Sequence, residues 1–268
     1  MLLANKTVAI HIKKITKEYK LPTPIPFLYR IHDEPKQENL LEALEIIHSL
    51  GYKVTKKRIT PNDINKLLQR VRFAPGGDVI NQVLIRSMPK AVYSPVNIGH
   101  YGLGFTDYTH FTSPIRRYAD LIVHRLLKEY MVELPDSKRL KKIAEKTTQA
   151  AVHISDTERQ AMEAERASTK LAATIYANMM LGGVFDGTVS GVVQYGVFVM
   201  LDIIYCEGLL HTHDMRDDYY QFDAKKMRIT GKRTKHTYSL GSKVRVRIIK
   251  VNIEKRQIDL ALVNNEEN

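Results

Sequence analysis

Residues 99–125 (GHYGLGFTDYTHFTSPIRRYADLIVHR) concentrate side chains that bind phosphates and nucleobases. Arg116, Arg117 and Arg125 carry planar guanidinium groups, which can contact a phosphate through two hydrogen bonds at once. Aromatic rings in the same stretch can stack on bases. These rings belong to Tyr101, Phe105, Tyr108, Phe111 and Tyr118. The residue types therefore indicate binding of a polyanion that carries bases.

This stretch is predicted to place two of its arginines at the start of a helix. Ser113 is a typical N-cap residue, and Pro114 suits the first helical position. We therefore expect a helix from Ile115 to about Tyr130, with Arg116 and the next arginine in its first turn. The helix dipole disfavours cations there unless an anion is bound. On spacing alone, two simply solvated arginines are an equally good interpretation.

Composition narrows the class of protein. The 268 residues are 44% hydrophobic and 26% charged, which is typical of a globular protein with room for two domains. The 41 Lys and Arg against 29 Asp and Glu give a net charge of +12, which favours nucleic acid first and an anionic membrane second. Cys206 is the single cysteine, so an intramolecular disulfide and a cysteine metal cluster are excluded. We expect no membrane span and a cytoplasmic location.

The first part of the chain is predicted to be mainly helical. Residues 27–32 alternate in polarity as a strand does, after a proline-broken extended stretch. Residues 38–50, 60–71 and 78–87 have helical periodicity with N-cap, proline or glycine signals at their ends. We interpret these three helices as scaffold with a solvated outer face.

A long helix is predicted over residues 137–181. Apolar or small residues recur in it at steps of three and four, or sums of these. They are Ile143, Ala150, Ile154, Thr157, Ala161, Ala164, Leu171 and Ile175. Considered alone, the charged residues within this helix, including Glu163 and Glu165, are expected on its surface.

The pattern changes to period two after Gly182 and Gly183, which predicts β-strands from Val184 onward. The polar, basic residues 214–233 interrupt the strands, and they are either a disordered loop or an arm that contacts phosphates. A histidine metal site is disfavoured, because His211 and His213 are expected on opposite faces of a strand. His100, His110 and His124 likewise lack a ligand spacing such as HExxH.

The run HFTSPIRRYADLIVHR, with GHYGL just before it, resembles the motif of the RNB family of exoribonucleases, and HFTSPIRRY is nearer its ribonuclease R branch. Ala119 stands where the family commonly has proline. The segments LLAN near the start and RIHD at 30–33 also resemble the family. Because the family's LLAN segment lies well inside the catalytic domain, the chain resembles the second half of that domain.

The resemblance implies a processive 3′→5′ exoribonuclease that hydrolyses single-stranded RNA to nucleoside 5′-monophosphates. It implies catalytic roles for Arg116, which would neutralise charge on the scissile phosphate, and for Glu165, which matches a glutamate in the family's MAERRA segment. Asp120 and His124 are expected to be buried scaffold that pairs with the arginines. The residues expected to position the RNA are His110, Thr112, Ser113, Arg117 and Tyr118.

The last part of the chain resembles the OB-fold RNA-binding domain of the ribosomal protein S-one type. The resemblance rests on VFDGTVSGVVQYGVFVMLD, EGLLHTHDM and LGSKVRVRIIKVNIEKRQIDLAL. One barrel face in such a module offers rings and cations to RNA. The alternative for Phe185 and Phe198 is that they fill the barrel. The residues that match RNA-binding positions are Phe185, Tyr195, Phe198, His211, Lys250 and Arg256.

The expected fold class is α+β. Residues 1–182 are predicted to be the helix-rich second half of an RNB catalytic domain, and residues 183–268 a five-stranded OB-fold barrel. The family uses Mg²⁺ held by a cluster of aspartates, since this hard cation requires oxygen ligands. Aspartates in the first domain are scattered singly, and the adjacent pair Asp217 and Asp218 lies in the insertion. We therefore expect no metal ligands in this chain and place them upstream of it.

Single-stranded RNA is the expected partner, and the missing first half of the RNB domain is a possible second one. We expect the chain alone to bind RNA and to hydrolyse little of it. Two alternatives stay open at this point: a non-catalytic RNA-binding protein that is a truncated paralogue, and one half of a split enzyme.

Overall fold

The computed structural model describes residues 1–49, 51–52, 60–72, 77–215, 218–224 and 226–263. The chain divides into two compact units. The first unit comprises Met1–Lys36 and Met88–Met162, and the second comprises Gln37–Ser87 and Glu163–Asn268. Each unit is considered by itself.

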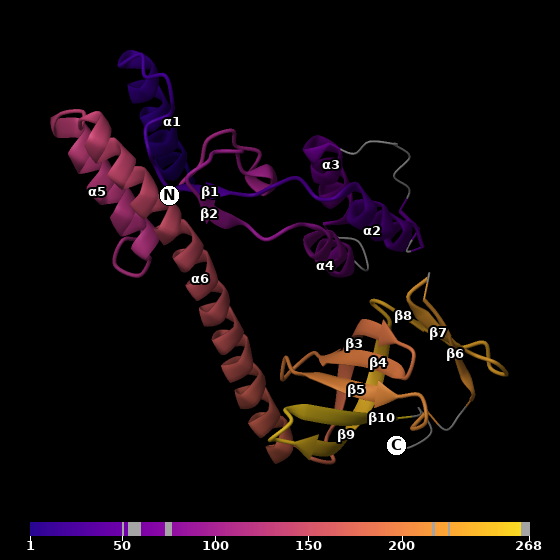
Figure 1. Cartoon of the computed structure of the whole chain (residues 1–268). Helices are drawn as coiled ribbons and strands as arrows, with labels where there is room; N and C mark the ends of the chain where they lie inside the picture. Colours follow the sequence, from indigo (N-terminus) through magenta and orange to yellow (C-terminus); the bar gives the residue numbers. More distant parts are fainter. Residues whose placement is uncertain (50, 53–59, 73–76, 216–217, 225, 264–268) are drawn as a thin grey trace. The chain divides into compact units, whose positions relative to one another are not determined.

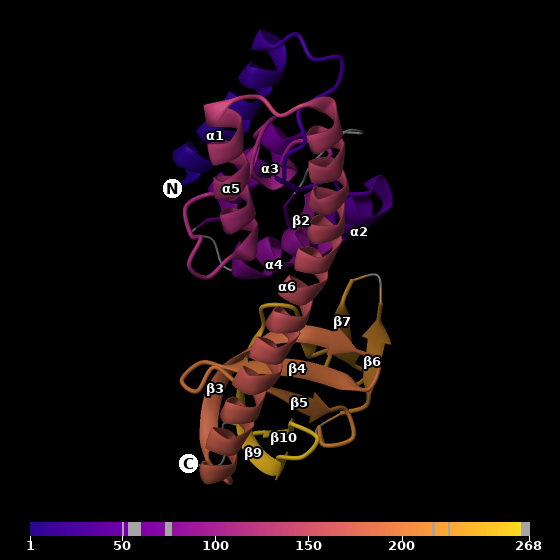
Figure 2. The same cartoon turned by 60° about the vertical axis from the view of Figure 1, so that its left-hand side comes forward.

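Three helices build the first unit. They are α1 (Leu2–Glu18), α5 (Tyr118–Val132) and the first part of α6 (Ser137–Met179), and they lie side by side in Figure 1 and in Figure 2. Apolar side chains at helical spacing from all three meet the segment around Phe27 and Leu28, both of which are fully buried. Burial of this continuous apolar core holds the helices together.

A short two-stranded sheet crosses this unit. β1 (Tyr29–Ile31) pairs antiparallel with β2 (Val92–Ser94), and the register sets Arg30 opposite Tyr93. The predicted strand 27–32 is therefore correct in type but shorter, because the backbone on either side bonds elsewhere. The carbonyl of Leu28, for example, accepts a hydrogen bond from Thr109 Oγ1 at 2.6 Å.

The three predicted scaffold helices are present in the second unit. They are α2 (Gln37–Ser49), α3 (Pro61–Val71) and α4 (Gly77–Ser87), and α4 contacts both others. Thr60 and Asp63 cap α3 reciprocally, because each side chain accepts a hydrogen bond from the other's backbone N–H. Gly51 follows α2 with a φ of +92°, which confirms the expected stop signal, while Leu50 lies outside the described residues.

The predicted apolar seam of α6 is only partly buried. Ile143 and Ile154 are buried in the first unit as expected. Residues 155–173, all of them described, include no buried side chain, so Ala161 and Ala164 do not lie in a packed core. Their spacing is helical, and both side chains are exposed.

A closed five-stranded barrel follows α6, which confirms the expected OB-like architecture. Its strands are hydrogen-bonded in the order β10-β5-β4-β3-β9 (Figure 1). Alternate apolar side chains such as Val197, Val199 and Leu210 are fully buried inside it, because successive strand residues face opposite sides. The strands are β3 (Val184–Val193), β4 (Gly196–Leu201), β5 (Glu207–His211), β9 (Lys243–Asn252) and β10 (Gln257–Leu262).

The insertion between β5 and β9 forms its own antiparallel sheet. β6 (Tyr220–Asp223), β7 (Arg228–Gly231) and β8 (Thr237–Ser239) are paired in that order, and β7 and β8 contact β3 of the barrel. The disordered-loop interpretation is therefore wrong for the described residues. Tyr238 and Ile229 anchor the sheet through their buried side chains.

The described helices include none that is both long enough and apolar enough to cross a bilayer. The Cys206 thiol is free and buried, and its burial raises the pKa of the thiol to about 11.

The core of the first unit makes a direct stability prediction. Phe27→Ala removes a fully buried ring where the surrounding helices cannot collapse freely, so we expect a loss of about 3–5 kcal/mol in the free energy of unfolding. Urea denaturation measures this loss. Ile115→Ala is the matched control, since Ile115 is fully exposed and should change stability little. Equal losses in both variants would contradict the described core.

Candidate functional site

The segment before α5 forms a separate turn. The carbonyl of Ser113 accepts hydrogen bonds from the N–H groups of Arg116 (3.3 Å) and Arg117 (3.0 Å). Arg117 then adopts an extended backbone and is the N-cap of α5, which begins at Tyr118. The predicted helix start at Ile115 was therefore wrong, and the two arginines do not lie in a helical first turn.

The carboxylate of Asp120 explains this geometry. Asp120 is fully buried, and its Oδ2 accepts the backbone N–H of Ser113 at 2.7 Å. The Arg117 guanidinium meets both oxygens, with Nη2 2.9 Å from Oδ2 and Nε 2.9 Å from Oδ1. A buried carboxylate requires such partners, so the turn is fixed by its need for donors. The expected pairing of Asp120 with an arginine is present.

The two adjacent arginines consequently differ in availability. The charge of Arg117 is neutralised inside the protein by Asp120. Arg116 is exposed, and its side chain makes no hydrogen bond or ion pair with any described residue. Arg116 is therefore the member of the pair that can meet an external anion with its full fork of donors.

A polar network surrounds His110, one of the predicted RNA-positioning residues. His110 Nδ1 is 2.8 Å from the hydroxyl of Tyr93, and the Tyr93 N–H donates to Ser155 Oγ at 3.0 Å. The Arg30 guanidinium lies over the Tyr93 ring at 4.6 Å and pairs with Glu158 at 2.6 Å. Sequence reasoning missed the role of Arg30 and its partners, although Arg30 begins the RIHD segment.

Burial sets the protonation states of His110 and Tyr93 near neutral pH. Burial, helped by Arg117 and Arg30, lowers the pKa of His110 to about 3. Burial raises the pKa of Tyr93 to about 12. A neutral His110 can orient a ligand through hydrogen bonds but cannot attract a phosphate by charge.

The other predicted residues of this stretch occupy different environments. Tyr118 is 54% exposed at the start of α5, whereas Thr112 is half-buried beside the turn. Tyr108 is 4% exposed and its hydroxyl accepts a hydrogen bond from Asn5, so the expectation that its ring stacks on bases was wrong. His124 stacks on Phe111 at 4.2 Å instead of pairing with an arginine.

Glu165 lies on the part of α6 that belongs to the second unit. Its side chain is exposed, and it makes no hydrogen bond or ion pair with another described residue. The catalytic role expected for Glu165 stays a prediction.

The strand register of the barrel places two expected RNA-binding residues, Phe198 and Lys250, in one row across its outer face. Cross-strand register sets Gly191 opposite Phe198, Phe198 opposite Leu209, Leu209 opposite Asp259 and Asp259 opposite Lys250. We call these five residues the outer row. A side chain on Gly191 would touch the Phe198 ring, so the glycine lets that ring lie against the strand.

Further rings lie beside the outer row, two positions along the β4–β5 pair, where Gly196 is opposite His211. Tyr195, 55% exposed, and His211 have ring centroids 6.0 Å apart. The His211 and His213 rings are 4.9 Å apart, so their predicted placement on opposite faces was wrong. The cause is that β5 ends at His211 and the chain turns there. Arg256 lies in the turn between β9 and β10 with a φ of +53°.

Phe185 lies on the other side of its strand. It is paired with Val246, which is fully buried inside the barrel, and Gly187 two residues on is buried as well. Its position favours the alternative that Phe185 fills the barrel. The Phe198 side chain lies on the outer face of its strand, because both its strand neighbours, Val197 and Val199, point inward and are fully buried.

Within the described residues, no group of three or more His, Cys, Asp or Glu side chains lies close enough to hold a metal ion. The placement of the Mg²⁺ ligands upstream of this chain stays a prediction.

Two domain families match the chain. Residues 1–133 match the RNB domain, and residues 179–262 match the S1 RNA binding domain. The chain therefore joins an RNB domain to an S1 RNA binding domain.

Similar proteins and solved structures are of the ribonuclease R type. Ribonuclease R of Escherichia coli (strain K12) is 35% identical over 99% of this chain and 33% of its own length. Ribonuclease R of Aquifex aeolicus is 37% identical over 100% of this chain and 37% of its own. Mycoplasma genitalium RNase R in its apo form superposes with a TM-score of 0.86 at 26% identity, covering 98% of this chain and 40% of that one. The chain thus belongs to the RNB family, ribonuclease R type, and spans about a third of the length of these curated relatives.

The buried histidine predicts a pH dependence of stability. His110 has a pKa of about 3 when folded and an ordinary value of 6.5, so below about pH 6.5 the unfolded chain binds more protons. The free energy of unfolding should therefore fall as the pH drops from about 6.5 toward 3. His110→Asn, which keeps a partner for Tyr93, should flatten this fall in urea denaturation series.

The control for this experiment is His153→Asn, because His153 is exposed on α6. It should retain the pH dependence of the unchanged chain. A His110→Asn variant with an undiminished fall would contradict the neutral, buried state of His110.

Proposed function

We propose that this chain is the RNA-binding part of a ribonuclease R-type exoribonuclease. The whole enzyme would degrade single-stranded RNA processively in the 3′→5′ direction and release nucleoside 5′-monophosphates. The observation that carries the proposal is the contrast between Arg117, neutralised by buried Asp120, and Arg116, left exposed at the same turn. A solved relative, Mycoplasma genitalium RNase R in complex with ribose methylated single-stranded RNA, superposes with a TM-score of 0.85 at 26% identity and supports the RNA assignment.

Arg116 is assigned to the scissile phosphate. Its guanidinium would stabilise the negative charge that develops on the phosphate oxygens, which is an electrostatic contribution of several kcal/mol in a water-poor site. Neutral His110 and Tyr93, held by Arg30 and Ser155, would orient the RNA end without competing for its charge. Glu165 is assigned to the leaving nucleotide or to the orientation of a water.

The barrel is assigned to the RNA strand upstream of its end. Phe198 in the outer row and the neighbouring rings of Tyr195 and His211 offer stacking surfaces for successive bases. Lys250 and Arg256 would follow the phosphates on the adjoining strands. This arrangement is tolerant of sequence, since every base has a π-face.

Mg²⁺ is part of the proposed reaction of the whole enzyme, in which it would activate the attacking water. Its ligands would come from outside the described residues, and a part of the RNB domain that this sequence does not span is the proposed source. A cytoplasmic location is also proposed, because the buried reduced thiol of Cys206 suits a reducing compartment.

A second candidate function is RNA binding without cleavage, by the chain alone or as one half of a split enzyme. The closed barrel with its outer row favours it, because RNA binding there needs no other part of the protein. Mixing the chain with Mg²⁺ and a 3′-tailed RNA tests whether the chain by itself binds RNA without cleaving it. We expect binding with little release of monophosphates, and processive release by the chain alone would contradict this expectation.

Arg116→Ala tests the proposed phosphate contact. Where the protein cleaves RNA, we expect a loss of about 10²–10³-fold in rate, since a transition-state contact is removed. RNA affinity should fall modestly, with the slope of log K against log salt shallower by about 0.7 for one lost phosphate contact. Fluorescence anisotropy across a salt series measures this slope.

The matched control for Arg116 is Arg86→Ala, which removes an exposed arginine from α4. Both variants lose one positive charge, so a purely general electrostatic effect would change their RNA affinity alike. The same salt slope in both would refute the assignment of Arg116.

Phe198→Ala tests the outer row. Loss of one stacking ring should weaken single-stranded RNA binding by ~1–3 kcal/mol. Phe185→Ala is the comparison, because Phe185 lies on the barrel-filling face and should lower thermal stability more than affinity. Unchanged affinity in a folded Phe198→Ala variant would move RNA binding off this face.

A further inference from the structure

The loop between β7 and β8, residues 231–236 (GKRTKH), is strongly basic and rigidly held. Asp218 braces it from outside: its Oδ2 accepts the N–H of Thr234 at 2.6 Å and the Thr234 hydroxyl at 2.7 Å. The N–H of Arg233 also donates to Asp218 Oδ2, at 2.9 Å. Lys232 and Lys235 are exposed on the loop. A single carboxylate thus fixes the backbone of a cationic loop.

Two further observations show how tightly this brace is built. Desolvation opposes ionisation of Asp218, yet the hydrogen bonds from Thr234 and Arg233 hold the pKa of its carboxyl far below the usual range. A side chain at Gly231 would collide with the Asp218 carboxylate. The loop therefore needs glycine at this position.

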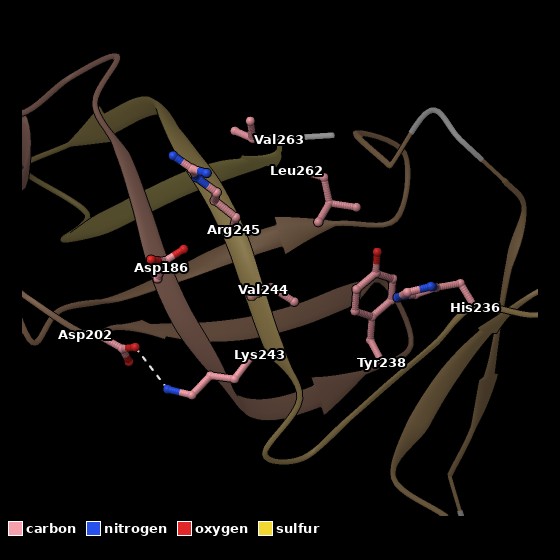
Figure 3. Close-up of a pocket in the computed structure, with 9 residues that line it drawn as sticks. All are labelled: Asp186, Asp202, His236, Tyr238, Lys243, Val244, Arg245, Leu262 and Val263. Carbon is pink, nitrogen blue, oxygen red and sulfur yellow. Dashed lines mark hydrogen bonds and ion pairs between the residues drawn. The ribbon is translucent and has the colours of Figure 1, made fainter. Parts of the chain in front are cut away.

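A cavity of about 670 Å³ adjoins the loop, with walls from β8, β3, β9 and the end of β10. Figure 3 shows His236 and Tyr238 on one side of it, with Arg245 and Asp186 across from them. The rings of His236 and Tyr238 are 4.7 Å apart. Lys243 at the rim is paired with Asp202 at 2.9 Å. The volume is in the range of small-molecule and nucleotide sites.

The lining matches the parts of one nucleotide. The exposed ring of His236 offers a face for stacking a base, and the Arg245 guanidinium can take a phosphate. Arg245 makes no side-chain hydrogen bond or ion pair with a described residue, so its donors are available. Asp186, paired with Arg245 in strand register, can accept a hydrogen bond from a ribose 2′-hydroxyl or a base amino group.

We propose that the Asp218-braced loop and this cavity form a second contact for single-stranded RNA, separate from the outer row. The proposal rests on the RNA-binding function proposed above. The outer row runs across β3, β4, β5, β10 and β9 through Phe198 and Lys250, whereas the second contact uses β8, the other end of β9 and the insertion sheet. An RNA strand long enough to reach both contacts would bind to both at the same time.

Asp218→Ala gives the sharpest test, because it separates a fixed loop from mere positive charge. The variant gains one unit of net positive charge, so general electrostatics alone would tighten RNA binding. The proposal expects the reverse: several-fold weaker binding of a fluorescein-labelled oligoadenylate of about 20 nucleotides, since the loop loses its brace. Glu42→Ala is the charge-matched control, because Glu42 is exposed on α2. Asp218→Ala binding as tightly as the control would overturn the proposal.

His236→Ala keeps the test decisive if the first variant fails to fold. We expect it to weaken binding of the long oligonucleotide by about tenfold, with little change for one of about 4 nucleotides that the outer row alone can hold. His153→Ala, which removes an exposed histidine from α6, should bind both as the unchanged chain does. Equal binding of the long oligonucleotide by His236→Ala and this control would refute the second contact.

The outcomes also separate this inference from the function on which it rests. Phe198→Ala should weaken binding of both oligonucleotides, because the outer row serves each. If the unchanged chain binds neither, the proposed function fails and the inference with it. If Phe198→Ala weakens binding while the Asp218 and His236 variants do not, only the second contact fails.

Discussion

The buried carboxylate of Asp120 is the constraint on which the proposed phosphate site depends. Removed from water, it must be satisfied by the backbone of Ser113 and the guanidinium of Arg117. That demand forces a turn ahead of α5, delays the helix to Tyr118, and directs Arg116 outward. Two adjacent arginines of the same residue type thereby acquire different functions, one structural and one available to an anion.

A network of polar side chains in the first unit is likewise held by mutual contacts. The antiparallel pair β1–β2 sets Arg30 directly across from Tyr93, and the tyrosine in turn bonds His110. Because these polar groups satisfy one another under partial burial, they form a connected and rigid network. Such a network suits a site that must position a substrate, since positioning requires groups that do not relax when the charge of the substrate changes.

In the insertion sheet a second carboxylate, that of Asp218, holds the backbone of a basic loop. Asp218 accepts backbone N–H groups from Arg233 and Thr234, much as Asp120 accepts the N–H of Ser113. Both carboxylates order the backbone beside basic side chains. The described residues of the insertion, for which the sequence left disorder and a phosphate-binding arm as alternatives, form part of an ordered sheet.

The sequence by itself determined the family, the scaffold helices and the strands of the barrel. Local chemistry such as the Thr60–Asp63 capping box, and the period-two pattern of the barrel, act between near neighbours and can be read directly. Only the tertiary structure decided that Arg116 and not Arg117 is available, and that Phe198 faces outward while Phe185 faces the barrel interior. These choices depend on contacts and strand registers that join residues distant in the chain, which no local pattern encodes.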